Sequence, residues 1–142
     1  LQLFDVSDLA APVLLHREVI GTRGTASDAA TNHLAFTWYP TLEALAVPMV
    51  ICEGGSGGAF GDEITFNGLL VYRVTAAEGF QPLGGVPHPQ PDSASCSTWW
   101  SSSTSPVKRS VFLEDWVYSI AADLIRIAGV ADLEHPVVDL EL

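Results

Sequence analysis

The feature that most constrains the fold of this chain is an internal repeat of a strand–turn–strand pattern. Residues 1–14 align without a gap on residues 125–138, and a weaker middle copy starts at Leu69. Apolar positions and the turn both coincide: Leu1 falls on Ile125, Leu3 on Ile127, Val6 on Val130, Asp8 on Asp132, Leu9 on Leu133 and Pro12 on Pro136. We therefore place repeat units near residues 1–20, 68–86 and 123–142.

Each copy has the same physical content, an apolar strand that runs into a small polar turn and then into a second strand. The turns are Ser7-Asp8, Thr75-Ala76 and Ala131-Asp132. An Asp in such a turn bonds to the backbone two residues further on. Proline opens the second strand at Pro12 and Pro136, and it pushes the preceding residue toward extended conformations.

Between the copies lie segments that read as β-hairpins. His33–Trp38 and Ala44–Ile51 are β-rich runs on either side of a turn that contains Pro40, which presets its φ. Ser110–Leu113 and Val117–Ile120 flank a second turn in the same way. Each period therefore holds four strands with local connections, which is the pattern of a β-propeller blade.

The predicted fold is all-β: a partial β-propeller domain over residues 1–142, with about two four-stranded antiparallel blades. Residues 53–63, rich in glycine, and 87–106, rich in proline and serine, are predicted as long loop insertions. An amphipathic helix over 119–133 is the rival interpretation, and the alignment of that stretch with residues 1–12 favours strands.

Two blades cannot close a ring, because propellers need about four to eight. We expect either a longer chain of which these are terminal blades, or association of chains. Exposed blade edges of this kind favour a homodimer.

The charge balance limits the partners. The net charge is −11, from 17 acidic and 6 basic residues. Nucleic acid and anionic membrane surfaces both need a basic surface, so neither is expected as a partner. The longest apolar run, Leu42–Ile51, is broken by Glu43 and Pro48 and is far too short to insert into a membrane.

Two cysteines, Cys52 and Cys96, lie in or beside the two loop segments. A Cys52–Cys96 disulfide between these loops is expected if the protein is exported. No CxxC or HxxxH spacing occurs, so no metal site is predicted. No cofactor is expected, and calcium stays an open alternative although no D-x-D-x-D-G loop is present.

A polar stretch that contains Arg23 and Asp28 leads to His33. A functional interpretation pairs Asp28 with His33 as an acid–base or metal corner. The structural interpretation is that these side chains satisfy buried backbone groups between blades, and it is favoured. Arg23, Asp28 and His33 are kept as candidate binding residues.

Three further motifs could carry function. Trp99-Trp100, in the serine-rich segment, either contacts a protein or carbohydrate ligand or folds back as an apolar cap. Gly54–Gly58 matches the G-x-S-x-G elbow around Ser56, but no helix is predicted after it, so catalysis there is not expected. Lys108-Arg109 faces Glu114-Asp115 across a predicted hairpin, which favours cross-strand ion pairing.

Several segments in order resemble the C-terminal β-propeller domain of a bacterial and archaeal family of secreted proteins, many of which look like lipoproteins. These segments are Phe4–Asp8 with Pro12, Val19–Thr25, Asn32–Phe36, Phe66–Gly68, Val71–Val74 with Gly79-Phe80, Val107–Ser110 and Asp132-Leu133. Asn32 stands where that family usually has Asp before the histidine, which weakens an acid–base role for His33. The resemblance implies an extracytoplasmic protein, whether secreted, periplasmic or lipid-anchored, and implies no reaction.

Two functions follow as expectations. The first is a non-enzymatic binding or scaffold module of a cell-envelope protein. The second is part of a hydrolase or lyase whose active site lies on the propeller axis, with most of its residues elsewhere, because fold alone does not decide function.

Overall fold

Three antiparallel sheets follow one another along the chain. The computed structural model describes residues 1–90, 92, 94–97 and 105–142. The first sheet has two strands and the other two have four each, in the orders β3-β4-β5-β6 and β10-β9-β8-β7. The strands are β1 (Gln2–Asp5), β2 (Val13–Arg17), β3 (Thr37–Tyr39), β4 (Ala44–Glu53), β5 (Glu63–Thr75), β6 (Gly79–Pro87), β7 (Val107–Leu113), β8 (Trp116–Ala121), β9 (Leu124–Gly129) and β10 (Val138–Glu141). The predicted all-β fold with four-stranded blades is confirmed.

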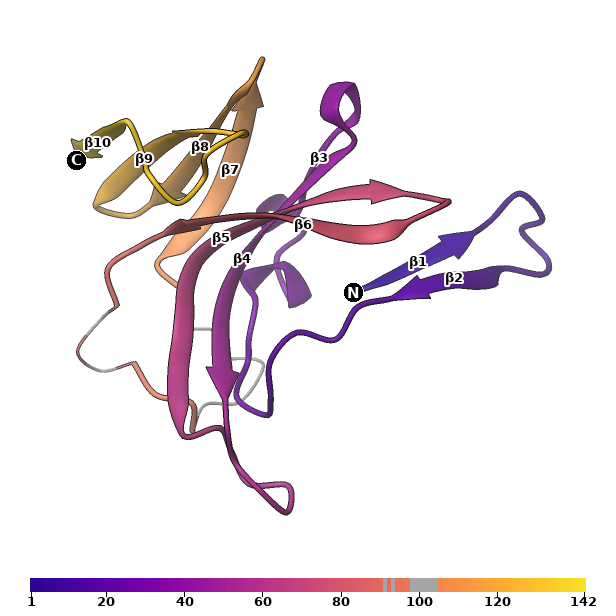
Figure 1. Ribbon diagram of the computed structural model, residues 1–142, viewed down its shortest axis with the longest axis horizontal. Coiled ribbons are helices and arrows are strands. Elements are labelled where there is room, and N and C mark those ends of the chain that lie inside the picture. Colours follow the sequence, from indigo (N-terminus) through magenta and orange to yellow (C-terminus); the bar gives the residue numbers. More distant parts are fainter. Residues whose placement is uncertain (91, 93, 98–104) are drawn as a thin grey trace.

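The sheets are stacked side by side. The β3–β6 sheet lies between the β1–β2 hairpin and the β7–β10 sheet, and the two termini lie far apart (Figure 1). Each four-stranded sheet is a meander in which every strand pairs with the next along the chain. Short local connections suffice for this topology, which is why strand and turn alternate so regularly in the sequence.

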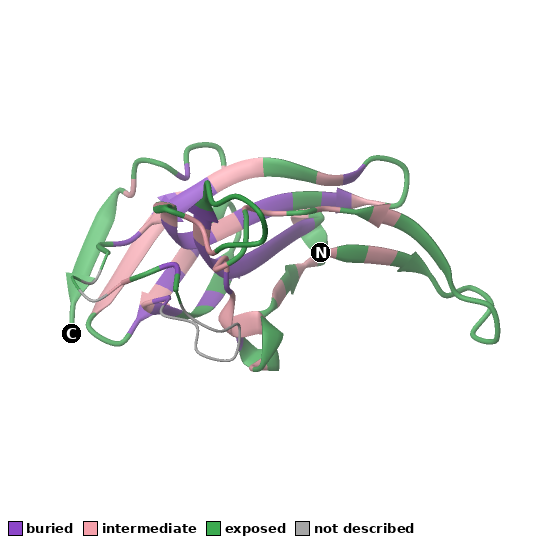
Figure 2. Cartoon of the chain, turned by 90° about the horizontal axis from the view of Figure 1, so that it is seen from below, coloured by how far each residue is buried: buried purple, intermediate pink, exposed green. Residues whose placement is uncertain are grey.

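The middle sheet is packed against other sheets on both faces, and this explains why its strand β4 is apolar over residues 44–52. Along β4, residues 44–50 are all buried, and the buried residues, in purple, gather in the middle of the molecule (Figure 2). Successive side chains on a strand point to opposite faces, so a strand covered on both sides must be apolar at every position. The run 44–52 meets this demand, whereas β7 alternates because only one of its faces is packed.

Two apolar cores result from this stacking. The first lies between the second and third sheets, and the second lies between the first and second sheets. The first core consists of Ala44, Ala46, Leu69, Val71, Val86, Val107, Phe112, Val117, Ala128 and Leu133. The second core consists of Leu45, Val47, Met49, Tyr72 and Val74, with Leu1, Leu3 and Phe80 packed against them.

The segment before β3 differs from the prediction. Residues His33–Ala35 form a 3₁₀ helix, η2, and the strand begins only at Thr37. The reason is local: the Asn32 side chain accepts a hydrogen bond from the Leu34 backbone N–H at 3.1 Å and caps the helix. Expecting a strand from His33 was therefore wrong.

Two further 3₁₀ helices complete the inventory of the described chain, η1 (Asp28–Ala30) and η3 (Pro40–Leu42). The helix η3 forms the turn between β3 and β4, where Pro40 predicts a turn. Residues 119–133 form β8 and β9, not the rival helix. Within the described residues, no helix is long and apolar enough to cross a membrane.

Replacing the most enclosed large side chain tests the core. Leu69, on β5, is fully buried between the second and third sheets. Leu69→Ala should lower the free energy of unfolding by about 3 kcal/mol, because it leaves a cavity that the sheets cannot close. Urea unfolding measures this. Leu9→Ala, on the tip of the β1–β2 hairpin, is the control and should change stability by less than about 0.5 kcal/mol. Equal effects would contradict the stacked-sheet core.

Candidate functional site

The two long loops meet at one end of the middle sheet. Cys52, near the end of β4, is joined to Cys96 by a disulfide with Cα atoms 5.9 Å apart. We call the surface formed by residues 21–25, 52–63, 88–90, 92 and 94–97 the loop platform. The bond ties segments 44 residues apart in sequence, and both candidate cysteines lie in this one place.

Arg23 holds the glycine-rich loop from the side. Its Nη1 donates to the Gly58 carbonyl at 2.6 Å, and its guanidinium carbon lies 4.2 Å from the centre of the Phe60 ring. The Gly61 N–H donates back to the Arg23 carbonyl at 2.7 Å. A cation over an aromatic face is attracted by the ring quadrupole. Arg23 therefore orders a loop and does not join Asp28 and His33.

Threonines bind the edge of the platform to β4. Thr22 N–H donates to the Cys52 carbonyl at 2.7 Å, and the Thr25 hydroxyl accepts from the Cys52 N–H at 3.0 Å. Gly24, between them, has φ +107°, and a side chain there would place its Cβ 2.3 Å from the Cys96 carbonyl oxygen. Only glycine allows this close approach. Residues 22–25 of the polar stretch thus fix the backbone beside the Cys52–Cys96 disulfide.

The platform carries a polar hollow of about 560 Å³. Its lining residues are Gly61, Asp62, Glu63, Ile64, Gln90, Ala94, Ser95, Cys96 and Ser97. The Asp62 side chain is held in place, because its carboxylate accepts a hydrogen bond from the Gly55 N–H at 2.9 Å. Carboxylate, amide and hydroxyl groups together suit a ligand that offers several hydrogen-bonding groups. Trp99 and Trp100 lie outside the described residues.

Asp28 and His33 are not brought together as an acid–base pair. Asp28, in η1, forms an ion pair with Lys108 of β7 at 2.9 Å. The His33 side chain, in η2, is exposed, and its backbone carbonyl accepts from the Phe36 N–H. Expecting Lys108 to pair across its own hairpin was wrong, because the stacking of sheets places Asp28 beside it. In the described ranges, no group of three or more His, Cys, Asp or Glu side chains is placed to hold a metal ion.

A serine–histidine pair that the sequence did not indicate lies between the second and third sheets. His88 Nε2 is 2.8 Å from the Ser119 hydroxyl, and the two residues are 6% and 0% exposed. Burial, then the charge of nearby Arg126, lowers the pKa of His88 to about 4. Arg126 itself bonds the Pro87 carbonyl, so the group links both sheets. No spacing in the sequence joins residues 31 apart on different sheets.

Ser56 lies in an exposed turn of the platform. Gly55, Gly57 and Gly58 around it all have positive φ, and β5 follows the loop, where a nucleophile elbow has a helix. The match to G-x-S-x-G is therefore a coincidence of composition.

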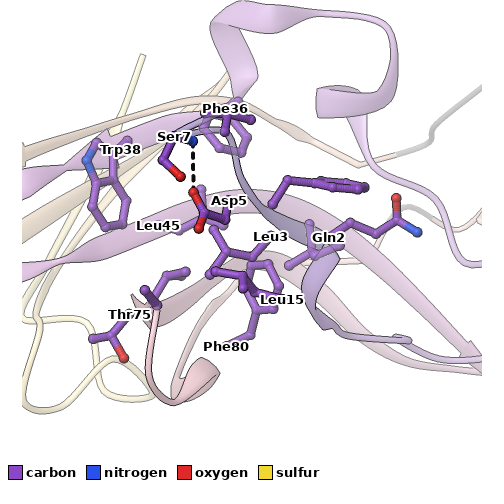
Figure 3. A pocket seen from close by; sticks show the side chains of 15 residues that line it. Gln2, Leu3, Asp5, Ser7, Leu15, Phe36, Trp38, Leu45, Thr75 and Phe80 are labelled. Carbon is purple, nitrogen blue, oxygen red and sulfur yellow. Dashed lines mark hydrogen bonds between the residues drawn. The ribbon is translucent and has the colours of Figure 1, made fainter. Parts of the chain in front are cut away.

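A second concave surface lies at the other end of the middle sheet. This apolar hollow, of about 720 Å³, opens between β1 and the face of β3 and β4 (Figure 3). Leu3, Phe36, Trp38, Leu45 and Phe80 line it, and Asp5 at its rim accepts from the Ser7 N–H at 2.8 Å.

Stacked four-stranded meanders, each turned onto the next through an apolar face, define a β-propeller. The comparison with known families agrees: the model of the β-propeller domain ("Beta propeller domain") matches residues 1–133. The chain belongs to this family. No curated protein and no solved structure matches it.

The disulfide should contribute strongly to stability. A bond that closes a loop of this length constrains the unfolded chain by about 4 kcal/mol in the chain-entropy model. Replacing both Cys52 and Cys96 by Ser should lower the free energy of unfolding by roughly that amount, measured by urea unfolding. Mass spectrometry is the check on the bond itself. Reduction should add two hydrogens, and free thiols in the air-oxidised protein would contradict the pairing.

Acid should loosen the contact between the second and third sheets through His88. Its pKa is about 4 in the folded chain against an ordinary 6.5, so the unfolded state binds more protons between these values. The free energy of unfolding must therefore fall as pH falls from 6.5 to 4. Melting temperatures should drop less over this range in His88→Gln, which cannot be protonated. The control His135→Gln removes an exposed histidine whose pKa Asp132 raises, and should leave the wild-type slope or steepen it. Equal slopes in wild type and His88→Gln would refute the role of His88.

Proposed function

We propose that this chain is a non-enzymatic binding or scaffold module whose partner docks on the loop platform. The observation that carries the proposal is the number of interactions that hold two long loops in place, although the sheets form without these loops. A disulfide, the Arg23 contacts and the Thr22 and Thr25 bonds all act within this one surface. Loops held rigid on a scaffold are where binding surfaces are commonly built, because ordering them beforehand lowers the entropic cost of binding.

The chemistry of the platform supports a partner rich in hydrogen-bonding groups. Asp62, Glu63, Gln90 and Ser97 surround its polar hollow. The hydroxyls of a carbohydrate or the exposed groups of a protein loop offer matching donors. The tryptophans of the 87–106 segment, Trp99 and Trp100, stay candidate contacts for such a partner.

The placement of His88 and Ser119 also supports a role without catalysis. His88 and Ser119 are of the types that serve as base and nucleophile, but both are enclosed between two sheets. A nucleophile must reach its substrate to act. In this position the His88 Nε2 and the Ser119 hydroxyl satisfy each other where the sheets meet, while His88 Nδ1 is buried without a hydrogen-bond partner among the described residues.

The disulfide supports an extracytoplasmic location. Such bonds persist in secreted, periplasmic and cell-surface proteins and are rare where thiols are kept reduced. We therefore propose that the module belongs to an exported, envelope-associated protein. Its acidic net charge of −11 suits neither nucleic acid nor an anionic membrane surface.

Binding measured on matched variants tests the platform. Wild type, Arg23→Ala and Arg73→Ala would be screened on an oligosaccharide array and against a displayed peptide library. Arg23→Ala should weaken any selected ligand at least tenfold, because the Gly58 and Phe60 contacts that order the loop are lost. Arg73→Ala removes the same charge at the far end of β5, ten residues from Glu63, and should leave affinity unchanged.

Two results would overturn the proposal. One is a ligand whose affinity falls equally with both variants, because it would not use the platform. The other is turnover of chromogenic ester or glycoside substrates above the rate of the blank, because it would show catalysis.

A further inference from the structure

Four polar side chains meet at one margin of the contact between the second and third sheets. Asn67 of β5 and His88, directly after β6, lie opposite each other, because the His88 N–H donates to the Asn67 carbonyl at 2.8 Å. Ser119 of β8 pairs in the same way with Arg126 of β9. Each of the four lies two residues from a member of the first core on its own stretch of chain. Strand alternation therefore turns all four side chains into the space between the two sheets.

The two pairs are joined across the interface. His88 Nε2 lies 2.8 Å from the Ser119 hydroxyl, and Arg126 Nη1 donates to the Pro87 carbonyl of the middle sheet. The outer nitrogen of the guanidinium, Nη2, donates to the exposed Asp139 at 3.1 Å. The Arg126 side chain thus runs from the solvent inward, and its Nε is a buried atom.

The orientation of the Asn67 amide follows from its partner. Its Nδ2 donates to the Pro89 carbonyl at 3.1 Å. A carbonyl oxygen can only accept, so the amide nitrogen must be on the side of Pro89 and Oδ1 is turned away from it. Oδ1 is the acceptor that remains to be satisfied.

Unsatisfied polar atoms are concentrated in this group. Among the described residues, the buried side-chain nitrogen and oxygen atoms without a hydrogen-bond partner are Asn67 Oδ1, His88 Nδ1 and Arg126 Nε. Asn67 and His88 are only 7% and 6% exposed. Buried polar atoms in folded proteins almost always bond to protein or to ordered water. Three such atoms in one group of neighbouring side chains therefore indicate a shared ligand.

The chemistry of the three atoms selects the kind of ligand. Arg126 Nε–H only donates, Asn67 Oδ1 only accepts, and His88 Nδ1 does either, according to the tautomer. Burial, then the charge of Arg126, lowers the pKa of His88 to about 4, so the imidazole is neutral at neutral pH. A metal cation has nothing to accept from Arg126, and an anion has nothing to donate to Asn67. A small neutral molecule that both donates and accepts satisfies all three atoms.

We propose that one ordered water molecule binds between the second and third sheets and bridges Asn67 Oδ1, His88 Nδ1 and Arg126 Nε. Water accepts from Arg126 Nε–H and donates to Asn67 Oδ1, and it has one donor and one acceptor left for either tautomer of His88. Groups this enclosed are beyond the reach of a larger ligand. The water makes this margin a hydrated joint, in which the sheets meet closely although their polar side chains do not meet directly. The inference is independent of the proposed function of the loop platform.

Counting long-lived water molecules tests the site. Oxygen-17 relaxation dispersion of the solvent measures how many water molecules stay in the protein for longer than it takes to tumble. In Asn67→Leu the count should fall by one molecule relative to wild type, because a methyl group replaces the acceptor Oδ1. Gln81→Leu is the matched control, since it makes the same kind of change at an exposed position of β6. Its water count should equal that of wild type.

A measurement on the wild-type protein locates the water. In nitrogen-15-labelled protein, the Arg126 Nε–H proton should give cross-peaks to water of opposite sign in the laboratory-frame and rotating-frame Overhauser experiments. Opposite signs identify a proton beside a bound water, whereas simple exchange with solvent gives equal signs. The exposed Arg109 is the internal control, and its Nε–H should show exchange alone.

Two results would overturn the proposal. One is a folded Asn67→Leu protein that holds as many long-lived water molecules as wild type. The other is a wild-type Arg126 Nε–H without a bound-water cross-peak, and a scalar coupling from Nε to His88 Nδ1 would then show that the two atoms bond directly. This second measurement decides the matter even if Asn67→Leu does not fold.

Discussion

The structure depends on close face-to-face packing between the second and third sheets. Small side chains on β4, Ala44 and Ala46, let β7 approach, and Phe112 then stacks on Tyr39 in the space they leave. The opposite residues of β4, Leu45 and Val47, serve the other face. One strand thus belongs to two cores at once. A slip of its register by one residue would exchange small and large side chains between the two cores, so the packing on both faces specifies the register of this strand.

Polar bonds at the margins fix how the two sheets meet. Thr37 and Ser110 share a hydrogen bond between β3 and β7, Asp28 pairs with Lys108 nearby, and His88 with Ser119 elsewhere in the interface. Apolar contact is not directional, whereas these pairs are satisfied in one arrangement only. These polar pairs give the packing its specificity. His88 contributes while its imidazole is neutral, because a protonated ring buried at this place would destabilise the interface.

The sequence predicted the strands and their local pairing well but several side-chain contacts between distant residues poorly, for a physical reason. Apolar alternation and turn residues are local, so the sequence repeat alone locates a hairpin in each of the three sheets. Asn32 is local too, but its capping bond competes with the β-rich run that follows it, and composition favoured the wrong outcome. Pairs such as Asp28 with Lys108, 80 residues apart, form only because sheets stack, and no spacing records that. The polar stretch indicates Arg23 as a candidate, but nothing in the sequence indicates that Phe60 is its aromatic partner.

The disulfide between Cys52 and Cys96 also changes the consequence of cleaving the backbone within the ring that it closes. β5 and β6 lie within the covalent ring that it closes, together with the exposed glycines of the 54–58 turn. A protease that cuts this turn opens the backbone, but the two fragments stay attached through sulfur, each still paired with its neighbours in the middle sheet. This exposed turn can therefore be severed without releasing either half, for as long as the surroundings remain oxidising.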